Sequence, residues 1–256
     1  MINMLNNCEH DDEKKFKQNY GNISYPLKNR YNPIIPMNIF QTWNSKKIPL
    51  LMANTFYKIK NLNPEFNYYL YDDNDCYNFI KKNFDQDILN AYNSLIPGAY
   101  KADLWRYCIL YKFGGIYLDI KYEPLNNFKF INLIESEHFV SDINNIDIYN
   151  ALIVCKPGNT VLLDAINEIV KNVKNKFYGE TFLAPTGPKL LSNFLSTNNK
   201  IVDLTHKELY NNNNYKLIFL NNIPILKSYK GHIKERDINS KNPHYSVLWN
   251  NKYIYK

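Results

Sequence analysis

The sequence predicts an α/β domain in which strands alternate with helices around a central sheet. Short apolar segments alternate along the chain with longer segments of helical periodicity, which is typical of layered α/β domains. The chain has 256 residues, enough for one domain to bury a full core. Hydrophobic residues make up 45% of the chain and charged residues 21%, a globular rather than a disordered composition.

The expected strands are short apolar runs. The first is expected at 38–43 and the second at 66–71. The run at 116–118 is followed by Asp119 and Lys121. Because side chains alternate along a strand, these two should point the same way, at the carboxyl end where open α/β sheets bind ligands. Further strands are expected at 139–141, 151–156 and 215–220.

The expected helices carry apolar residues at helical spacing. The segment 99–113 is apolar almost all round, which is typical of a buried helix, and Gly114 and Gly115 can take the left-handed conformation that ends it. The acidic cluster at 72–75 lacks the glycine and distal glutamate of an EF-hand loop, so we interpret it as a helix N-terminus. The other helices are expected at 49–61, 74–84, 159–173 and 188–195.

Charge, cysteines and hydropathy exclude several classes of function. The net charge of +7 permits anionic partners, but the lysines form no block, so we expect no nucleic acid partner. The four cysteines show no paired short spacing and suit reduced thiols. No apolar run of membrane-spanning length occurs, and residues 1–30 do not resemble a signal peptide. We therefore expect no membrane span, and either a cytoplasmic location or an excised catalytic domain.

Two segments carry a family resemblance. One is Ala102-Asp-Leu-Trp-Arg106-Tyr, followed by Gly114-Gly-Ile-Tyr-Leu-Asp119-Ile-Lys121, and the other is Ile35-Pro-Met-Asn-Ile-Phe-Gln41-Thr-Trp43. Thr186-Gly-Pro188 is a weaker third match. Together they resemble the DXD-motif sugar transferases of glycosyltransferase family 32, typified by the yeast initiating mannosyltransferase, and more distantly the clostridial glucosylating toxins. The resemblance implies a GT-A fold: a single Rossmann-like domain at 32–256, with a mixed central sheet flanked by helices, after a polar N-terminal arm at 1–31.

The resemblance also implies an activity. The chain would move a hexose from a UDP- or GDP-linked sugar to a hydroxyl of a glycan or protein acceptor, with retention of anomeric configuration. The alternative is a non-catalytic module, derived from such an enzyme, that binds nucleotide sugars or glycans. Lys121 keeps this alternative open, because it stands where the family has the second aspartate of its signature.

Three charged residues are the expected catalytic group. Asp103 and Arg106 are three residues apart, so they share one face of a buried helix, where a charged pair needs a partner or a ligand. From the residues alone, they form either an internal salt bridge or contacts with the donor. By resemblance, Asp103 would bind sugar hydroxyls and Arg106 sugar or phosphate, while Asp119 would contact metal, ribose or sugar.

Lys121 changes the expected electrostatics. An aspartate pair holds a divalent cation through oxygens, whereas Asp119 with Lys121 sums to zero charge. Lys121 would either bind the diphosphate and replace the cation, or turn to solvent while Mn²⁺ or Mg²⁺ stays, held by Asp119 and a C-terminal ligand such as His244. The divalent metal is therefore in doubt.

The remaining candidates would line the donor and acceptor sites. Gln41, Thr42 and Trp43 end the first expected strand, beside the base in GT-A folds. Trp43 either lines this pocket or packs in the core. The other binding candidates are Lys101, Tyr117, Lys121, Asn150 and Trp249.

Overall fold

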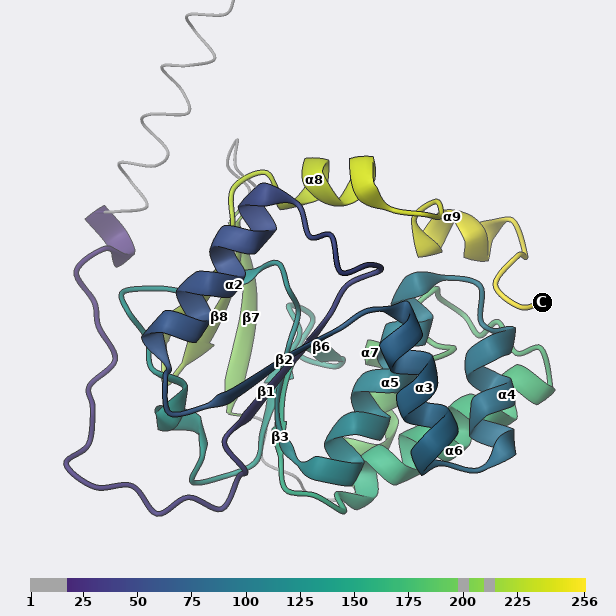
Figure 1. The fold of residues 1–256 in the computed structure, drawn as a ribbon, viewed down its shortest axis with the longest axis horizontal. Coiled ribbons are helices and arrows are strands. Elements are labelled where there is room, and N and C mark those ends of the chain that lie inside the picture. Colours follow the sequence, from purple (N-terminus) through teal and green to yellow (C-terminus); the bar gives the residue numbers. More distant parts are fainter. Residues whose placement is uncertain (1–17, 198–202, 210–214) are drawn as a thin grey trace, which may run out of the picture.

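Nine strands of the described chain form one mixed sheet, in a computed structural model that describes residues 18–197, 203–209 and 215–256 (Figure 1). The sheet order is β2-β1-β3-β6-β5-β7-β8-β9-β4. Neighbours are parallel at β1–β2, β1–β3 and β5–β7, and antiparallel elsewhere. The strands are β1 Asn38–Thr42, β2 Asn67–Tyr71, β3 Gly115–Leu118, β4 Tyr122–Pro124, β5 His138–Ser141, β6 Ile148–Cys155, β7 Leu204–Leu209, β8 Tyr215–Leu220 and β9 Ile223–Ser228.

The sheet curls because of one short connection. β3 is third in the order and β4 is last, yet only residues 119–121 join them. A link of three residues cannot span a flat sheet of this width, since each residue reaches at most about 3.6 Å. The edge formed by β8, β9 and β4 therefore folds back towards β3.

Helices cover both faces of the sheet. Helices α3 to α7 gather on one side, while α2 lies apart from them and packs against β4 (Figure 1). Buried apolar side chains form two large clusters, one against each face. The helices are α2 Leu50–Leu62, α3 Asp73–Asn83, α4 Gln86–Ser94, α5 Gly98–Phe113, α6 Thr160–Lys174, α7 Pro188–Thr197, α8 His232–Asn239 and α9 Tyr245–Asn250, with a 3₁₀ turn at Phe130–Leu133.

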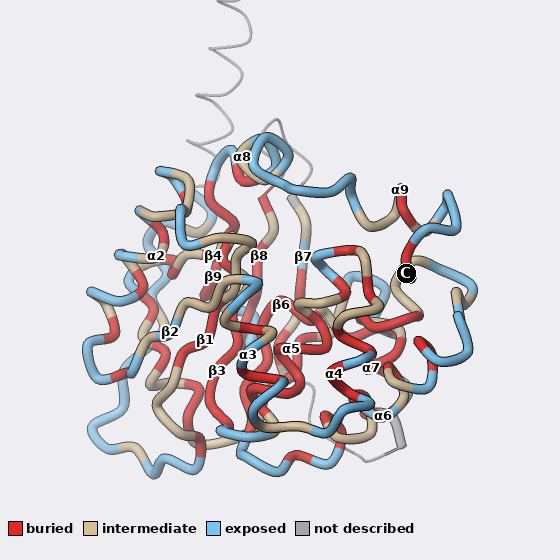
Figure 2. The backbone as a smooth tube through the Cα atoms, turned by 45° about the vertical axis from the view of Figure 1, so that its right-hand side comes forward, coloured by how far each residue is buried: buried red, intermediate tan, exposed pale blue. Residues whose placement is uncertain are grey.

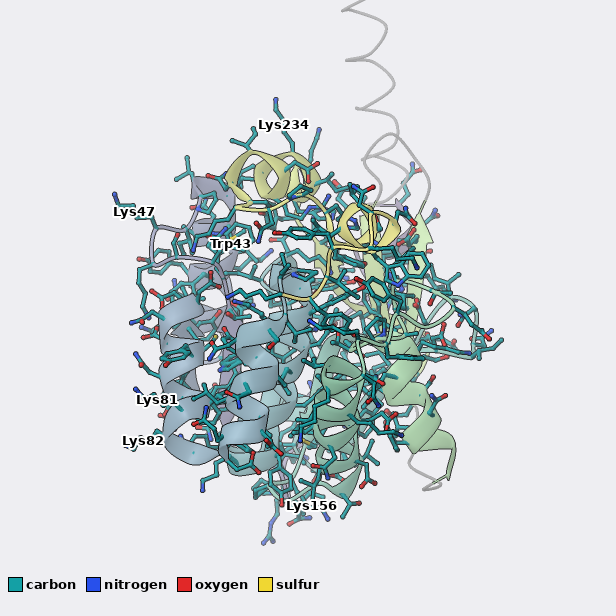
Figure 3. The ribbon with its side chains drawn as sticks, turned by 90° about the vertical axis from the view of Figure 1, so that its right-hand side faces the viewer. Trp43, Lys47, Lys81, Lys82, Lys156 and Lys234 are labelled. Carbon is teal, nitrogen blue, oxygen red and sulfur yellow. The ribbon has the colours of Figure 1, made fainter. Side chains whose placement is uncertain are left out.

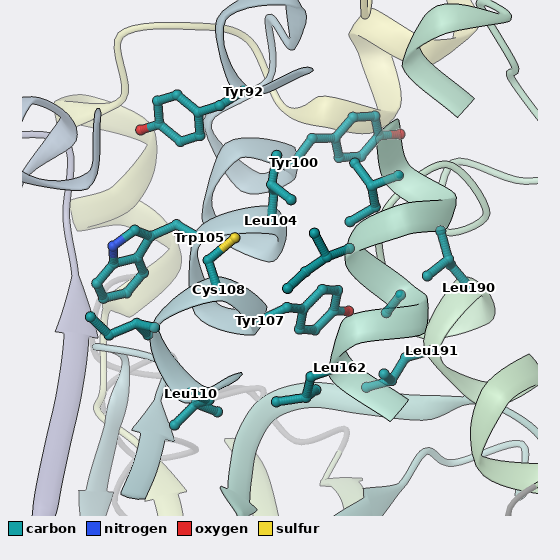
Figure 4. Close-up of a cluster of buried hydrophobic side chains, with 14 of the residues drawn as sticks. Tyr92, Tyr100, Leu104, Trp105, Tyr107, Cys108, Leu110, Leu162, Leu190 and Leu191 are labelled. Carbon is teal, nitrogen blue, oxygen red and sulfur yellow. The ribbon is translucent and has the colours of Figure 1, made fainter. Parts of the chain in front are cut away.

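Helix α5 is buried on nearly every side, as its sequence predicts. Leu104, Trp105 and Cys108 are fully buried among side chains of neighbouring helices and β3 (Figure 4). Gly114 and Gly115, with φ of +60° and +112°, end the helix. At Gly115, a Cβ would lie 2.7 Å from the Asn38 carbonyl oxygen, so only glycine lets β3 begin so close to β1.

The acidic cluster before α3 is a helix cap. Asp72 accepts from the backbone N–H of Asp75, and the Asp75 carboxylate accepts from that of Asp72, which forms a reciprocal capping box. The interpretation of these residues as a helix N-terminus is confirmed. Burial follows the strands and the inner faces of the helices (Figure 2). In the described segments, we find no helix with the length and apolarity needed to cross a membrane.

Candidate active site

Residues 119–121, between β3 and β4, form the centre of the candidate site. The backbone N–H of Asp119 donates to the Ala151 carbonyl on β6 at 2.8 Å. The N–H of Tyr229 donates to the Lys121 carbonyl at 3.0 Å. Hydrogen bonds from two other parts of the sheet therefore fix this turn and the side chains that it carries.

The Asp119 carboxylate accepts hydrogen bonds from three side chains. Lys121 Nζ donates to Oδ2 at 2.6 Å. The Tyr117 hydroxyl donates to Oδ1 at 2.8 Å, and Arg106 Nη1 lies 3.3 Å from the same oxygen. Asp119 and Lys121 point the same way, as the strand alternation predicts, and Lys121 is turned towards the carboxylate rather than into solvent.

The Arg106 guanidinium connects α5 to β3 and β6. Its Nε donates to the Ala102 carbonyl at 3.2 Å, and Nη1 donates to the Asn150 carbonyl at 2.7 Å. Its Nη2 lies 3.4 Å from Asp103 Oδ1, and the guanidinium carbon lies 4.3 Å from the centre of the Tyr117 ring. Arg106 is buried, with 6% of its surface exposed, so these partners replace its hydration.

Asp103 is the buried end of the same network. Thr186 Oγ1 donates to its Oδ2 at 2.8 Å, and Asn150 Nδ2 lies 3.3 Å from Oδ1. Asn150 Nδ2 also donates to the Tyr107 hydroxyl at 2.5 Å, and that hydroxyl donates to the Thr186 carbonyl at 3.2 Å. Asn150 Oδ1 is buried and has no hydrogen-bond partner among the described residues.

Thr186 and Tyr107 were not expected as site residues. Both stand in segments that carry the family resemblance, Thr186 at the head of Thr186-Gly-Pro188 and Tyr107 directly after Arg106. Their positions within these segments were the signal in the sequence by which they could have been found. A hydroxyl that bonds a carboxylate from 83 residues away cannot be found from spacing alone.

Burial and ion pairing act in opposite directions on the pKa values of this network. Burial alone would raise the pKa of Asp119, but the positive charges of Lys121 and Arg106 outweigh it and lower this pKa to about 2. Burial alone would lower the pKa of Lys121, but Asp119 outweighs it and raises this pKa. Burial raises the pKa of Asp103 against the opposing charge of Arg106. With all four groups ionised, two acidic and two basic side chains cancel.

The three candidates at the end of the first strand have partners outside the charged network. Gln41 is fully buried and accepts a hydrogen bond from the Tyr68 hydroxyl, and Thr42 Oγ1 donates to the Tyr71 carbonyl at 2.9 Å. Trp43 is half-buried in a small apolar cluster that includes Ile120. It lies at the end of the molecule that also bears Lys47 and Lys234 (Figure 3). A nucleotide contact by these three residues stays a prediction.

Three further candidates have contacts outside the network. Lys101 Nζ lies 5.2 Å from the centre of the Tyr92 ring. His244 is the N-cap of α9, where its Nδ1 lies 2.7 Å from Ser246 Oγ. Trp249 Nε1 donates to the Tyr178 carbonyl at 2.7 Å. Their roles towards donor or metal stay predictions, whereas Tyr117, Lys121 and Asn150 lie with the catalytic candidates.

The residues around Asp119 do not fit a divalent cation. Both carboxylate oxygens already accept hydrogen bonds, and the positively charged Lys121 ammonium lies 2.6 Å from Oδ2, where it repels a second cation. Across the ranges that the structure describes, no three His, Cys, Asp or Glu side chains form a group that could hold a metal ion. A metal role for Asp119 with His244 therefore gains no support from this arrangement.

A cavity of about 380 Å³ adjoins the network. Tyr149 lines it and also lies beside Lys121, whose Nζ is 5.3 Å from the centre of the tyrosine ring. Tyr149 directly precedes Asn150 on β6, so one strand contributes to both the network and the cavity. The volume of the cavity lies within the range of small-molecule sites, roughly 300–1,000 Å³.

Comparison with known proteins bears on this arrangement directly. Residues 49–140 match the family model described as glycosyltransferase sugar-binding region containing DXD motif. Inositol phosphoceramide mannosyltransferase 3 of Schizosaccharomyces pombe is 28% identical over 181 residues, which cover 70% of this chain and 50% of the relative. Initiation-specific alpha-1,6-mannosyltransferase of Candida albicans is 30% identical over 115 residues, which cover 43% of this chain and 29% of the relative.

The fold is also similar to that of a solved structure. The PaToxG glycosyltransferase superposes with a TM-score of 0.50 at 17% sequence identity, covering 64% of this chain and 69% of that one. This likeness confirms the GT-A fold. The chain spans half or less of the length of the two mannosyltransferases. Asp103, Arg106, Asp119 and Lys121 all fall within the stretch that matches the family model of glycosyltransferase sugar-binding regions containing a DXD motif.

Proposed function

We propose that this chain transfers a hexose from a nucleotide-diphosphate sugar to a hydroxyl acceptor, a glycan or a protein. The observation that carries the proposal is the network of Asp103, Arg106, Asp119 and Lys121, which lies beside a cavity and within the family's sugar-binding region. A buried core gains little from four charged side chains, because the desolvation of ions offsets much of their mutual attraction. A ligand with hydroxyls and phosphates gives such a network a use.

The position of each side chain indicates which part of the donor it would bind. Lys121 uses one of its three N–H groups on Asp119, and its side chain is 25% exposed, so other N–H groups can reach a diphosphate. Positive charge at the leaving diphosphate is what sugar transfer needs, because negative charge develops there in the transition state. We therefore assign this task to Lys121.

Asp103 and Asn150 suit the sugar. The Asp103 carboxylate accepts from Thr186 and Asn150, and the buried Asn150 Oδ1 beside it still lacks a donor among the described groups. A sugar hydroxyl could donate to that oxygen and remove the cost of a buried, unpaired acceptor, about 1–3 kcal/mol. Arg106 holds these groups in register with Asp119 through its hydrogen bonds to both strands.

We propose retention of anomeric configuration. Family resemblance supports it, and so does the state of the carboxylates. Asp119 is held by three donors and has a pKa of about 2, which makes it a weak nucleophile. A front-face reaction, in which the acceptor attacks from the side of the departing diphosphate, needs no enzyme nucleophile. Proton NMR of the anomeric signal of the first-formed product tests this assignment.

The test of function is a screen of UDP-glucose and GDP-mannose. We expect a nucleotide sugar to raise the melting temperature and to release free hexose slowly when no acceptor is present. Asp119→Asn should abolish release, with an unchanged circular dichroism spectrum. No shift and no release with either donor at millimolar concentration would contradict the proposal. Donor binding without any release or transfer would favour the non-catalytic binding module.

A further inference from the structure

The residues that line the cavity beside Lys121 are different from those of the catalytic network, although some come from the same segments. Its walls come from the segment before β6, from the loop that precedes α7, from β7 and β8, and from the first residue of α9. Tyr149 joins it to the network, since this side chain lines the cavity and lies beside Lys121. A molecule in the cavity would therefore lie next to a donor held at Asp119 and Lys121.

The walls combine aromatic faces with a charged edge. Tyr149 and His206 stack with their ring centres 3.8 Å apart and nearly parallel. Phe182 and Tyr245 form a second aromatic pair, with ring centres 5.6 Å apart. Charged lining residues are Asp142, Glu208 and Lys216. Apolar faces beside hydrogen-bonding groups match a pyranose ring, which carries C–H faces and a rim of hydroxyls.

His206 has an unused ring nitrogen. Its Nδ1 lies 2.8 Å from Asp142 Oδ1, while its Nε2 is buried and has no hydrogen-bond partner in the described part of the chain. His138 provides a comparison within the same sheet, because it is equally buried and pairs with Asp203 at 2.6 Å. Its Nε2, however, lies 3.1 Å from Ser136 Oγ. Of these two histidines, the one that lines the cavity lacks a second partner among the described residues.

Charges around His206 define which nitrogen is free to accept. Asp142 on the β5–β6 connection, Glu208 on β7 and Lys216 on β8 face the ring. The ionised Asp142 fixes the proton on Nδ1, which leaves a lone pair on Nε2. Burial lowers the pKa of His206, so the ring stays neutral at pH 7. A hydroxyl entering the cavity could then donate to Nε2.

We propose that this cavity is the acceptor subsite and takes a pyranose ring, with His206, held by Asp142, accepting a hydrogen bond from one of its hydroxyls. The inference rests on the proposed glycosyl transfer and names the substrate class of the second site. His206 acts here as a binding residue. Tyr149 and Tyr245 provide apolar contact for the ring.

Two variants test the cavity without touching the donor network. His206→Phe keeps a ring that can stack on Tyr149 but removes both nitrogens. Leu183→Trp places a larger side chain in the wall. The matched control is His138→Phe, which removes a histidine that is equally buried and equally paired to an aspartate, but outside the cavity lining.

The assay compares transfer with hydrolysis in the same protein. With UDP-glucose or GDP-mannose as donor, methyl α-mannopyranoside and methyl β-glucopyranoside serve as acceptors, and mass spectrometry measures both products. We expect the ratio of transfer to hydrolysis to fall about tenfold in His206→Phe and Leu183→Trp, through a lost hydrogen bond and a filled site. Hydrolysis without acceptor should stay within about twofold of wild type, and His138→Phe should keep the wild-type ratio.

A second measurement tests ligand binding in the cavity independently of turnover. Saturation-transfer NMR on the unliganded protein should detect methyl glycoside binding in the wild type and its loss in Leu183→Trp. Unchanged ratios and unchanged glycoside binding in Leu183→Trp would overturn the inference. If the wild type binds and cleaves no nucleotide sugar, the proposed function fails. Glycoside binding that Leu183→Trp abolishes would in that case still support the cavity as a glycan subsite.

Discussion

Replacement of Lys121 by methionine removes the positive charge next to Asp119 while it keeps most of the apolar stem. The pKa of Asp119 is about 2 against an ordinary 3.8, although burial alone would raise it. This difference corresponds to about 2 kcal/mol of preference for the ionised carboxylate. Lys121 contributes more of it than Arg106 does. Lys121→Met should therefore lower the free energy of unfolding by about 1–2 kcal/mol, which is about 2–8 °C in melting temperature.

The effect on donor affinity should be larger than the effect on stability. If Lys121 donates to the diphosphate, the variant loses a charge-assisted hydrogen bond worth about 1.5–3 kcal/mol. The dissociation constant for the nucleotide sugar should then rise about 10- to 150-fold. Lys58→Met is the control, because it breaks a lysine–carboxylate pair of 2.9 Å with Glu123 between α2 and β4, away from Asp119.

The metal question is decided by measuring donor hydrolysis in EDTA and with added Mn²⁺. Wild-type turnover should survive EDTA if Lys121 supplies the charge that a cation supplies elsewhere in the family. Lys121→Asp should create a demand for Mn²⁺, since two carboxylates beside a diphosphate need a divalent counter-charge. Wild-type activity that disappears in EDTA and returns fully with Mn²⁺ would refute the reasoning, as would a Lys121→Met variant with unchanged donor affinity.

Three further outcomes follow from single side chains. Asp119→Asn should reduce turnover on the order of 10²–10³-fold with the fold retained, measured as hexose release alongside circular dichroism; near-normal release would remove Asp119 from the site. Gly115→Ala should destabilise the chain by more than about 1 kcal/mol in urea unfolding, because φ is +112° and the new Cβ would meet the Asn38 carbonyl oxygen at 2.7 Å; an unchanged midpoint would contradict this. Burial lowers the pKa of His232 to about 4, so the unfolded chain takes up this proton first as the pH falls. Stability should decline between about pH 6.5 and pH 4, and His232→Gln should flatten that decline in melting curves.

The sequence was most informative where local rules and tertiary structure agree. The all-round apolar helix, the glycine pair after it and the strand at β3 were predicted within a residue or two, because burial on every side leaves a composition that no surface helix shares. Strand β8 was predicted with its bounds, from a run that is apolar except at Lys216. Asp119 and Lys121 could be grouped in advance, because alternation along one extended segment places their side chains on the same side.

Several parts of the fold and site were not predicted from the sequence, each for its own physical reason. β4 is held as a strand by antiparallel pairing with β9, and its three residues are too few for a strand pattern to be recognised in the sequence. Helix α4 was also missed, although it is amphipathic and begins at an aspartate cap, Asp85, because it follows α3 with almost no break. The role of Thr186 was not foreseen, since its bond to Asp103 depends on how the loop before α7 packs against α5. Helix α9 is short, and its cap, His244, was expected as a metal ligand instead.

Lys121 also changes the net charge of the proposed donor site before any substrate binds. A pair of aspartates without its cation is a site of uncompensated negative charge, and it repels the diphosphate until metal binds. Here the ammonium is covalently part of the chain, and Asp119 raises its pKa, so the counter-charge is present without a bound cation. On the proposed function, donor binding should then require no prior metal and no rearrangement of Asp119, since Lys121 can keep that contact and donate its other N–H groups. The consequence is a donor affinity that depends on ionic strength but not on divalent cation concentration, and a titration at fixed ionic strength with varied Mn²⁺ separates the two dependences.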